Sequence, residues 1–202
     1  SMSGSGGVTV PHSTSLDTLP GGFTLSAWVQ PTTGATGYRT LFSKSPDPFA
    51  PEPEAVTNQL HIRVNENGHL QFVLNNHVDF GGFQGFTAAG LVPQNVWSFV
   101  TWTYNEAVHK IYVNGTEVFS EPFNQPWAGS TEPLGIGQGV EPFVGLIDEV
   151  RVYRGAQAPA AIAADMEKGL SDPVLGEILT FSQPGFSFEV ISQDIRQGPT
   201  GI

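Results

Sequence analysis

The amino-acid sequence predicts an all-β protein, a two-sheet antiparallel β-sandwich with one short helix toward its C-terminal end. Many short segments alternate apolar and polar residues with the period of two that a β-strand has. Two Asn-Gly pairs, at 67–68 and 114–115, stand between such segments, and Asn-Gly is a strong hairpin signal. A single helical pattern runs from 158 to 168, with Pro159 early and Gly169 just past its end.

The strand signals follow one another through most of the chain. Prolines and acidic residues predict a loop over 45–58, and the glycine-rich stretch 76–94 predicts a long loop or two very short strands. Strand-like pieces recur within 174–192. The other expected strands cover residues 23–30, 38–44, 60–64, 70–74, 97–104, 109–113, 116–119, 133–139 and 143–153.

Three parts are expected along the 202 residues, a length that suits one domain with a sandwich-sized core. Residues 1–6 (SMSGSG) read as a cloning remnant and flexible linker. Residues 7–170 form the sandwich domain. Residues 171–202 are a C-terminal extension that either packs on the sandwich or begins a following domain.

The composition excludes several classes of protein. The formal net charge is −11, with only 8 Lys and Arg residues, so a phosphate-backbone partner such as nucleic acid is not expected. No apolar run reaches membrane-spanning length. The absence of cysteine rules out disulfides, thiolate metal sites and cysteine nucleophiles. The acidic excess fits a soluble surface, a divalent cation or neutral ligands.

Several segments, in their order and spacing, resemble the laminin-G-like, concanavalin A-like jelly-roll family, which is related to pentraxins. The resemblance covers most of residues 8–168 and implies two antiparallel sheets packed face to face. It also implies an extracellular, mostly non-catalytic module of a larger surface or secreted protein, which binds glycans, peptides or proteins and often carries a structural calcium ion. The matching segments are SLDTLPGGFTLSAWVQP (15–31), TLFSKS (40–45), QLHIRVNENGHLQFVLNN (59–76), VPQNVWSFVTWTYNEAVHKIYVNGTEV (92–118), PLGIGQG (133–139) and FVGLIDEVRVYRGAQAPAAIAADM (143–166).

Asp148 is the candidate metal ligand. Strict alternation puts it on the same strand face as Leu146, Val150 and Val152, where a carboxylate needs a cation, backbone N–H donors or a place at the rim. The resemblance matches Asp148 to an aspartate that helps hold calcium in related glycoside hydrolases. Calcium at Asp148 is therefore one hypothesis, and hydrogen bonds from backbone N–H groups are the alternative. The acidic segment that often precedes the first strand in the family is replaced here by a Gly-Ser linker.

Candidate glycan-binding residues are aromatic side chains in loops and polar side chains on one strand face. Sugars stack on aromatic rings and hydrogen-bond to amide and charged groups. Trp127 is expected to be the most exposed tryptophan, whereas Trp28, Trp97 and Trp102 are assigned to the core or its edge. Folding of a loop tryptophan over the core, and ordinary solvation of a polar face, are the alternatives. The full set is Trp127, Asn124, Gln125, Phe83, Phe86, His61 and Arg63, with Gln71 on the same polar face.

No catalytic pattern emerges from the sequence. Glycosidases need two carboxylates at set separations, and the adjacent Asp148 and Glu149 face opposite ways on a strand. We therefore expect a non-enzymatic carbohydrate-binding or adhesion domain of the lectin type, whose partner is a glycan or a cell-surface protein. A protein-interaction or spacer module without glycan binding is the alternative, and a glycoside hydrolase is the third possibility.

Overall fold

The computed structural model describes residues 7–34, 36–45, 59–75, 82–139, 141–171, 181–183 and 186–188. The chain divides into two compact units, Ser1–Gly169 and Leu170–Ile202. The described part of the second unit is a small antiparallel hairpin of β12 (Phe181–Gln183) and β13 (Phe186–Phe188). Residues 46–58 of the loop predicted over 45–58 lie outside the described residues.

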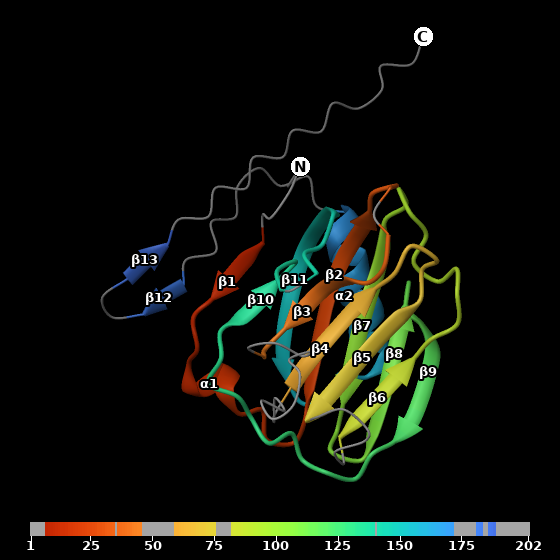
Figure 1. The fold of residues 1–202 in the computed structure, drawn as a ribbon. Helices are drawn as coiled ribbons and strands as arrows, with labels where there is room; N and C mark the ends of the chain where they lie inside the picture. Colours follow the sequence, from red (N-terminus) through yellow and green to blue (C-terminus); the bar gives the residue numbers. More distant parts are fainter. Residues whose placement is uncertain are drawn as a thin grey trace, which may run out of the picture. The chain divides into compact units, whose positions relative to one another are not determined.

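The first unit contains a six-stranded antiparallel sheet (Figure 1). Its strands lie in the order β1-β10-β3-β4-β5-β6. The hairpin predicted around residues 67–68 is the β4–β5 pair, and the glycine-rich stretch supplies the short edge strand β6. The strands are β1 (Val8–Val10), β3 (Arg39–Ser43), β4 (Gln59–Val64), β5 (Leu70–Asn75), β6 (Phe83–Phe86) and β10 (Leu134–Ile136).

A five-stranded antiparallel sheet packs against it and completes the predicted sandwich. The strand order is β11-β2-β7-β8-β9. Asn114 and Gly115, both at positive φ, make the two-residue turn between β8 and β9 that their sequence predicts. The strands are β2 (Phe23–Pro31), β7 (Ser98–Tyr104), β8 (Val108–Val113), β9 (Thr116–Pro122) and β11 (Gly145–Arg154).

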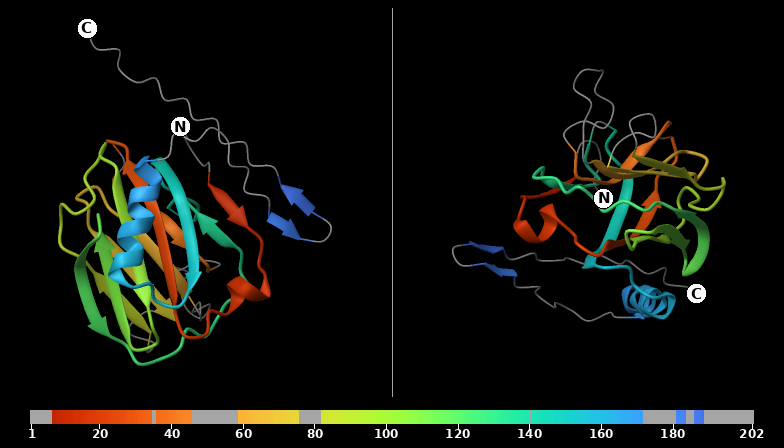
Figure 2. Two further views of the ribbon diagram at one scale, coloured as in Figure 1. Left: turned by 180° about the vertical axis from the view of Figure 1, so that it is seen from behind. Right: turned by 90° about the horizontal axis from the view of Figure 1, so that it is seen from below.

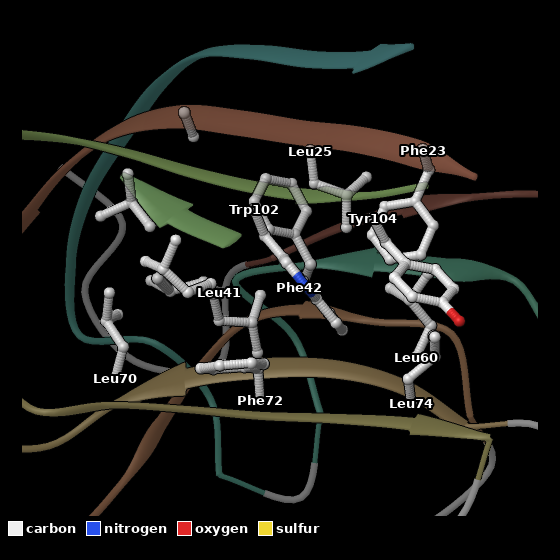
Figure 3. Close-up of a cluster of buried hydrophobic side chains, with 14 of the residues drawn as sticks. Phe23, Leu25, Leu41, Phe42, Leu60, Leu70, Phe72, Leu74, Trp102 and Tyr104 are labelled. Atoms are coloured by element: carbon white, nitrogen blue, oxygen red, sulfur yellow. The ribbon is translucent and has the colours of Figure 1, made fainter. Parts of the chain in front are cut away.

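The core between the sheets consists of the inward-facing half of each alternating strand (Figure 3). Trp102 of β7 lies at its centre, with its ring edge-on to Phe23 at a centroid distance of 5.0 Å and 5.4 Å from Phe72 of the other sheet. Leu60 and Leu74, which pair across β4 and β5, are fully buried beside them. Trp102 is therefore a core residue, as predicted.

Helix α2 (Pro159–Ser171), the predicted helix, covers the outer face of the five-stranded sheet (Figure 2). Ile162 and Met166 of α2 pack on Trp28, Phe99 and Tyr112 in a second apolar cluster. Strands β2 and β7 are consequently buried on both faces, with intermediate exposure only at Gln30 of β2. The other broad face of the sandwich is the outer face of the six-stranded sheet, where Phe86 of β6 is 50% exposed and the outward-facing side chains of β3, β4 and β5 are buried.

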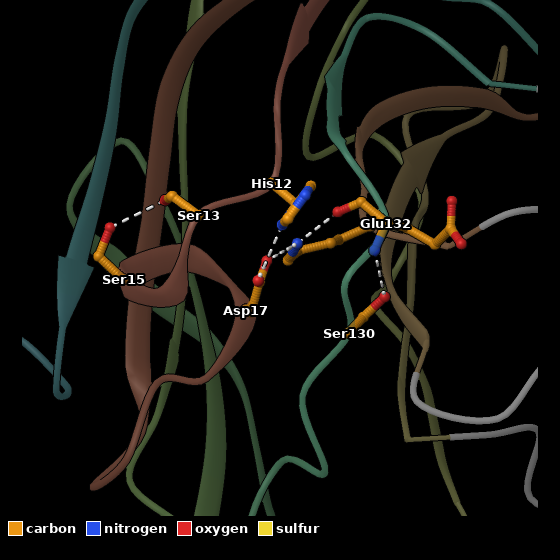
Figure 4. Close-up of polar contacts among 7 residues, drawn as sticks. His12, Ser13, Ser15, Asp17, Ser130 and Glu132 are labelled. Atoms are coloured by element: carbon orange, nitrogen blue, oxygen red, sulfur yellow. Dashed lines mark hydrogen bonds and ion pairs between the residues drawn. The ribbon is translucent and has the colours of Figure 1, made fainter. Parts of the chain in front are cut away.

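A short helix that the sequence pattern did not predict, α1 (Thr14–Asp17), precedes β2. Its Asp17 carboxylate accepts a hydrogen bond at 3.0 Å from the ammonium of Lys44, which is 2% exposed. The ammonium also donates to the backbone carbonyl of Glu132, and His12 lies 3.2 Å from Asp17 (Figure 4). Burial alone would raise the pKa of Asp17, but Lys44 and His12 outweigh it and the pKa is lowered. One buried cation thus ties α1 to β3 and to the segment before β10.

Candidate functional site

Four side chains on the outer face of the six-stranded sheet form a row that crosses four strands. Phe86 of β6 pairs with Gln71 of β5, Gln71 pairs with Arg63 of β4, and Arg63 pairs with Thr40 of β3. Their neighbours along each strand point into the core, so these four point outward. We call Phe86, Gln71, Arg63 and Thr40 the outer-face row.

Arg63 is the centre of this row. Its Nε donates to the Gln71 side-chain oxygen, and one terminal nitrogen donates to the Glu141 carboxylate. Its guanidinium carbon lies 4.3 Å from the centre of the Tyr38 ring, a cation–π distance. Burial lowers the pKa of Arg63, and the charge of Glu141 partly opposes that shift. The arginine therefore fixes an amide, a carboxylate and a phenol ring around itself.

The neighbouring row contains His61, which pairs with Ser43 on one side and Val73 on the other. The His61 ring nitrogen Nε2 lies 3.2 Å from the Thr40 hydroxyl oxygen, and the side chain is 1% exposed. Burial, reinforced by the charge of Arg63, lowers the pKa of His61 to about 3. The imidazole is therefore neutral at pH 7, and it supports Thr40 from below the surface.

Two side chains, Phe86 and Glu141, form the solvent-exposed part of the site. Phe86 is 50% exposed, and the Glu141 side chain is 33% exposed. Phe86 faces outward because alternation turns Gly85 inward, where the Phe72 ring leaves no space for a side chain: a Cβ on Gly85 would meet that ring at 2.4 Å. An aromatic ring and a carboxylate thus stand at the surface, at either side of the buried arginine.

The structure brings three of the predicted ligand residues, Phe86, Arg63 and His61, to this one face, but two others lie in the core. Trp127 is 7% exposed and packs edge-on against Phe23 at a centroid distance of 6.4 Å. Phe83, which belongs to β6 and not to a loop, is also 7% exposed and stacks on His109 at 4.1 Å. The expectation that Trp127 is the most exposed tryptophan is wrong, and the alternative, a loop tryptophan folded over the core, is confirmed.

Asn124 and Gln125 are exposed, as predicted, but they follow β9 at the edge of the five-stranded sheet, outside the outer-face row. The Gln125 backbone carbonyl accepts a hydrogen bond from the Tyr104 hydroxyl, which ties this segment to the end of β7. Trp97, assigned from the sequence to the core or its edge, is 36% exposed and adjoins the exposed Val96. The exposed tryptophan of this chain is therefore Trp97.

Asp148 does not lie on the predicted face. A bulge between Asp148 and Arg151, with Glu149 at φ +52°, shifts the alternation. Val150 and Val152 face the core as a result, while Asp148 is exposed. Its carboxylate accepts a 2.8 Å hydrogen bond from the Glu149 N–H, which matches the hydrogen-bonding alternative.

Metal-binding side chains do not gather around Asp148. Within the described ranges, no three His, Asp or Glu residues group as a metal site. Calcium favours six to eight oxygen ligands, many of which can be backbone carbonyls. Calcium at Asp148 therefore stays a prediction.

Sequence reasoning identified Phe86, Arg63, His61 and Gln71 but missed Glu141 and Tyr38. Glu141 lies 78 residues from Arg63, in the connection to β11, and is held there by a 2.8 Å hydrogen bond from the Thr40 N–H to its carbonyl. Tyr38 precedes β3. Tyr38 was expected only as the first residue of the strand over 38–44, and Glu141 lies outside every expected strand, so the sequence did not connect either residue with Arg63.

Known proteins of similar fold include several glycan-binding domains. Domain 4 of AbnA, a GH43 extracellular arabinanase from Geobacillus stearothermophilus solved with arabinotriose, has a TM-score of 0.56 and 22% identity over 79% of this chain and 72% of its own. The CBM40 of the Ruminococcus gnavus IT-sialidase, bound to α2,3-sialyllactose, has a TM-score of 0.59 and 16% identity over 78% and 94%.

The binding domain of botulinum neurotoxin serotype D has a TM-score of 0.59 and 12% identity, over 82% of this chain and 40% of that domain's chain. At these identities the likeness shows a shared fold. A search among curated proteins finds no match. In the part of the chain that the structure describes, no helix has the length and apolar character needed to cross a membrane. The model of the concanavalin A-like lectin/glucanases superfamily matches residues 2–163, and the chain therefore belongs to that superfamily.

Proposed function

We propose that this domain is a non-catalytic glycan-binding module whose site is the outer-face row together with Tyr38 and Glu141. The observation that carries the proposal is the exposed Phe86 ring in the same row as a guanidinium that holds an amide and a carboxylate in place. An aromatic ring offers the apolar face of a sugar a stacking surface, and fixed polar groups orient its hydroxyls. Domains of the same fold that were solved with arabinotriose and sialyllactose support this function.

The arrangement of carboxylates supports binding without catalysis. Glycoside hydrolysis uses a pair of carboxyl groups on either side of the scissile bond. Among the described residues of the site, Glu141 is the single carboxylate, and one of its oxygens is engaged by Arg63. A lone carboxylate held by an arginine suits hydrogen bonding to hydroxyl groups better than proton transfer.

The domain acts, in this proposal, outside the cell as one module of a larger protein. The likeness to a domain of an extracellular arabinanase and to a sialidase module supports that setting. Such modules hold a catalytic or adhesive partner domain on a polysaccharide or a cell surface.

A glycan array with the wild type and two matched variants tests the site. Phe86→Ala removes the exposed ring of the row, whereas Trp97→Ala removes the other exposed aromatic ring, at a different place. We expect Phe86→Ala to weaken binding at least about tenfold, which is about 1.4 kcal/mol. Phe86→Tyr, which keeps a ring, should retain binding, and Trp97→Ala should leave it unchanged.

The alternative function is a protein-interaction module. The adjacent exposed side chains of Val96 and Trp97, at 51% and 36% exposure, are the observation that favours it. Loss of array binding in Trp97→Ala, with Phe86→Ala unaffected, would move the site away from the outer-face row. Silence of the correctly folded wild type across the array would favour the protein-interaction function.

A further inference from the structure

We infer that the outer-face row selects uncharged sugars and discriminates against acidic ones. This inference rests on the proposed function, and it names the class of glycan that the same site takes. It departs from an analogy with sialic acid-binding modules of the same fold, because this chain's own charges argue against a carboxylated ligand.

The charges at the row cancel. Among the described residues that face it, the ionised groups are Arg63 and Glu141, which form an ion pair. His61, one row away, carries no charge at pH 7 because burial holds its imidazole neutral. The chain as a whole has a net charge of −11. An acidic sugar therefore meets no excess positive charge at the row, and a repulsive field around it.

Two nitrogens of the Arg63 guanidinium already donate to protein groups. Recognition of a carboxylate by arginine relies on two parallel N–H donors aimed at the ligand. Here Nε donates to the Gln71 side-chain oxygen, and a terminal nitrogen donates to the Glu141 carboxylate. The guanidinium lies over the Tyr38 ring. An acidic sugar that pairs with the same terminal nitrogen has to compete with Glu141, and the two carboxylates would then share one site.

A neutral sugar can bind to the exposed groups of the row without displacing Glu141. The Glu141 side chain is 33% exposed, and a carboxylate has about four lone-pair positions, so it can accept further hydrogen bonds from sugar hydroxyls. The half-exposed Phe86 ring stands at the other end of the row for stacking. Gln84, with intermediate exposure on the same outward face, adds an amide that donates and accepts. These groups match hydroxyls and C–H faces and require no ligand charge.

Calorimetry with matched pairs of glycans tests the selection. The members of each pair differ by one acidic sugar residue: lactose with sialyllactose, and a xylo-oligosaccharide with and without a glucuronic acid branch. We expect the neutral member of whichever pair binds to have at least about tenfold higher affinity. An acidic member that binds as tightly, or more tightly, overturns the inference while the glycan-binding function stands.

Glu141→Gln separates charge from shape at the same position. The variant keeps an oxygen acceptor but leaves Arg63 without its counter-charge, so the relative affinity for the acidic member should rise about tenfold. Glu117→Gln is the control, because that carboxylate pairs with Lys110 on the other sheet and should leave the ratio unchanged. An unchanged ratio in Glu141→Gln overturns the inference. Failure of every glycan to bind overturns the proposed function itself, and this inference with it.

Discussion

The indole N–H of Trp102 donates a hydrogen bond to Nδ1 of His109 at 3.1 Å, in the interior of the sandwich. This bond assigns the proton of the neutral imidazole to Nε2, which is buried without a hydrogen-bond partner. The ring stacks on Tyr104 at 4.0 Å and on Phe83 at 4.1 Å. His109 is therefore a neutral aromatic ring of the core, and burial disfavours its protonation in the folded state.

The stability of the domain should fall steeply in mild acid. Burial lowers the pKa of His109 from 6.5 to about 3, and the pKa of His61 falls to about 3 as well. The unfolded chain binds protons at these groups below pH 6.5, whereas the folded chain does not. The contribution of these two groups to the free energy of unfolding is therefore complete above pH 6.5. It is lost as the pH falls toward 3, at about 2.7 kcal/mol per pH unit for the two groups together.

Urea unfolding between pH 4 and pH 7 measures this slope. His109→Phe should remove about half of it, because one of the two titrating groups is gone. Trp97→Ala is the control, since this exposed side chain does not titrate and its loss should leave the slope as it is. A His109→Phe slope equal to that of the wild type would contradict the neutral, buried state of His109.

Trp127 should matter for stability and not for ligand contact. Trp127→Ala removes a large buried ring from the Phe23 side of the core and should lower the free energy of unfolding by about 3–5 kcal/mol. Trp97→Ala, at the more exposed tryptophan, should lower it by less than Trp127→Ala does. Thermal or urea denaturation of both variants makes the comparison. Equal losses of unfolding free energy in the two variants would contradict the placement of Trp127 in the core.

Alternation along single strands made much of the fold predictable. The period of two in β4 and β5 correctly put Leu60 and Phe72 inside and Arg63 and Gln71 outside. The position of Phe86 in the same row depends on the pairing of β6 with β5, which no local pattern specifies. Glu141 completes the site from a connection 78 residues away, so it could come only from the assembled structure.

The wrong expectations for Trp127 and Asp148 have local physical causes. Trp127 was expected to be exposed because it lies in a loop, but the Asn75 side chain bonds to both Pro126 and Ala128 and holds that loop against the sheet. Asp148 was placed by strict alternation, and the bulge after it exchanges the two faces of β11. A bulge inserts one residue into a strand, and the alternation of apolar and polar residues did not indicate where this one lies.

Calcium at Asp148 predicts a metal-dependent melting temperature. A site that binds calcium only in the folded state adds about 2.7 kcal/mol at a free concentration of 100 times Kd. Differential scanning calorimetry of the wild type should then show a lower Tm after EGTA, and Asp148→Asn should abolish that difference. Identical melting with and without EGTA would leave Asp148 as the acceptor of the Glu149 N–H.

Lys44 should be more important for stability than any exposed lysine. Its ammonium is buried and bonds to the Asp17 carboxylate and the Glu132 carbonyl, so Lys44→Met leaves both acceptors without their donor. The Tm should fall by several degrees, because removal of one partner of a buried pair uncovers the desolvation penalty of the other. Lys110→Met is the matched control: the Lys110 and Glu117 side chains are 37% and 40% exposed, so their ion pair should contribute little. Limited proteolysis should also cut Lys44→Met first around α1, where the tie to β3 has been lost. Equal melting of the two variants would show that the buried ammonium does not hold this end of the sandwich together.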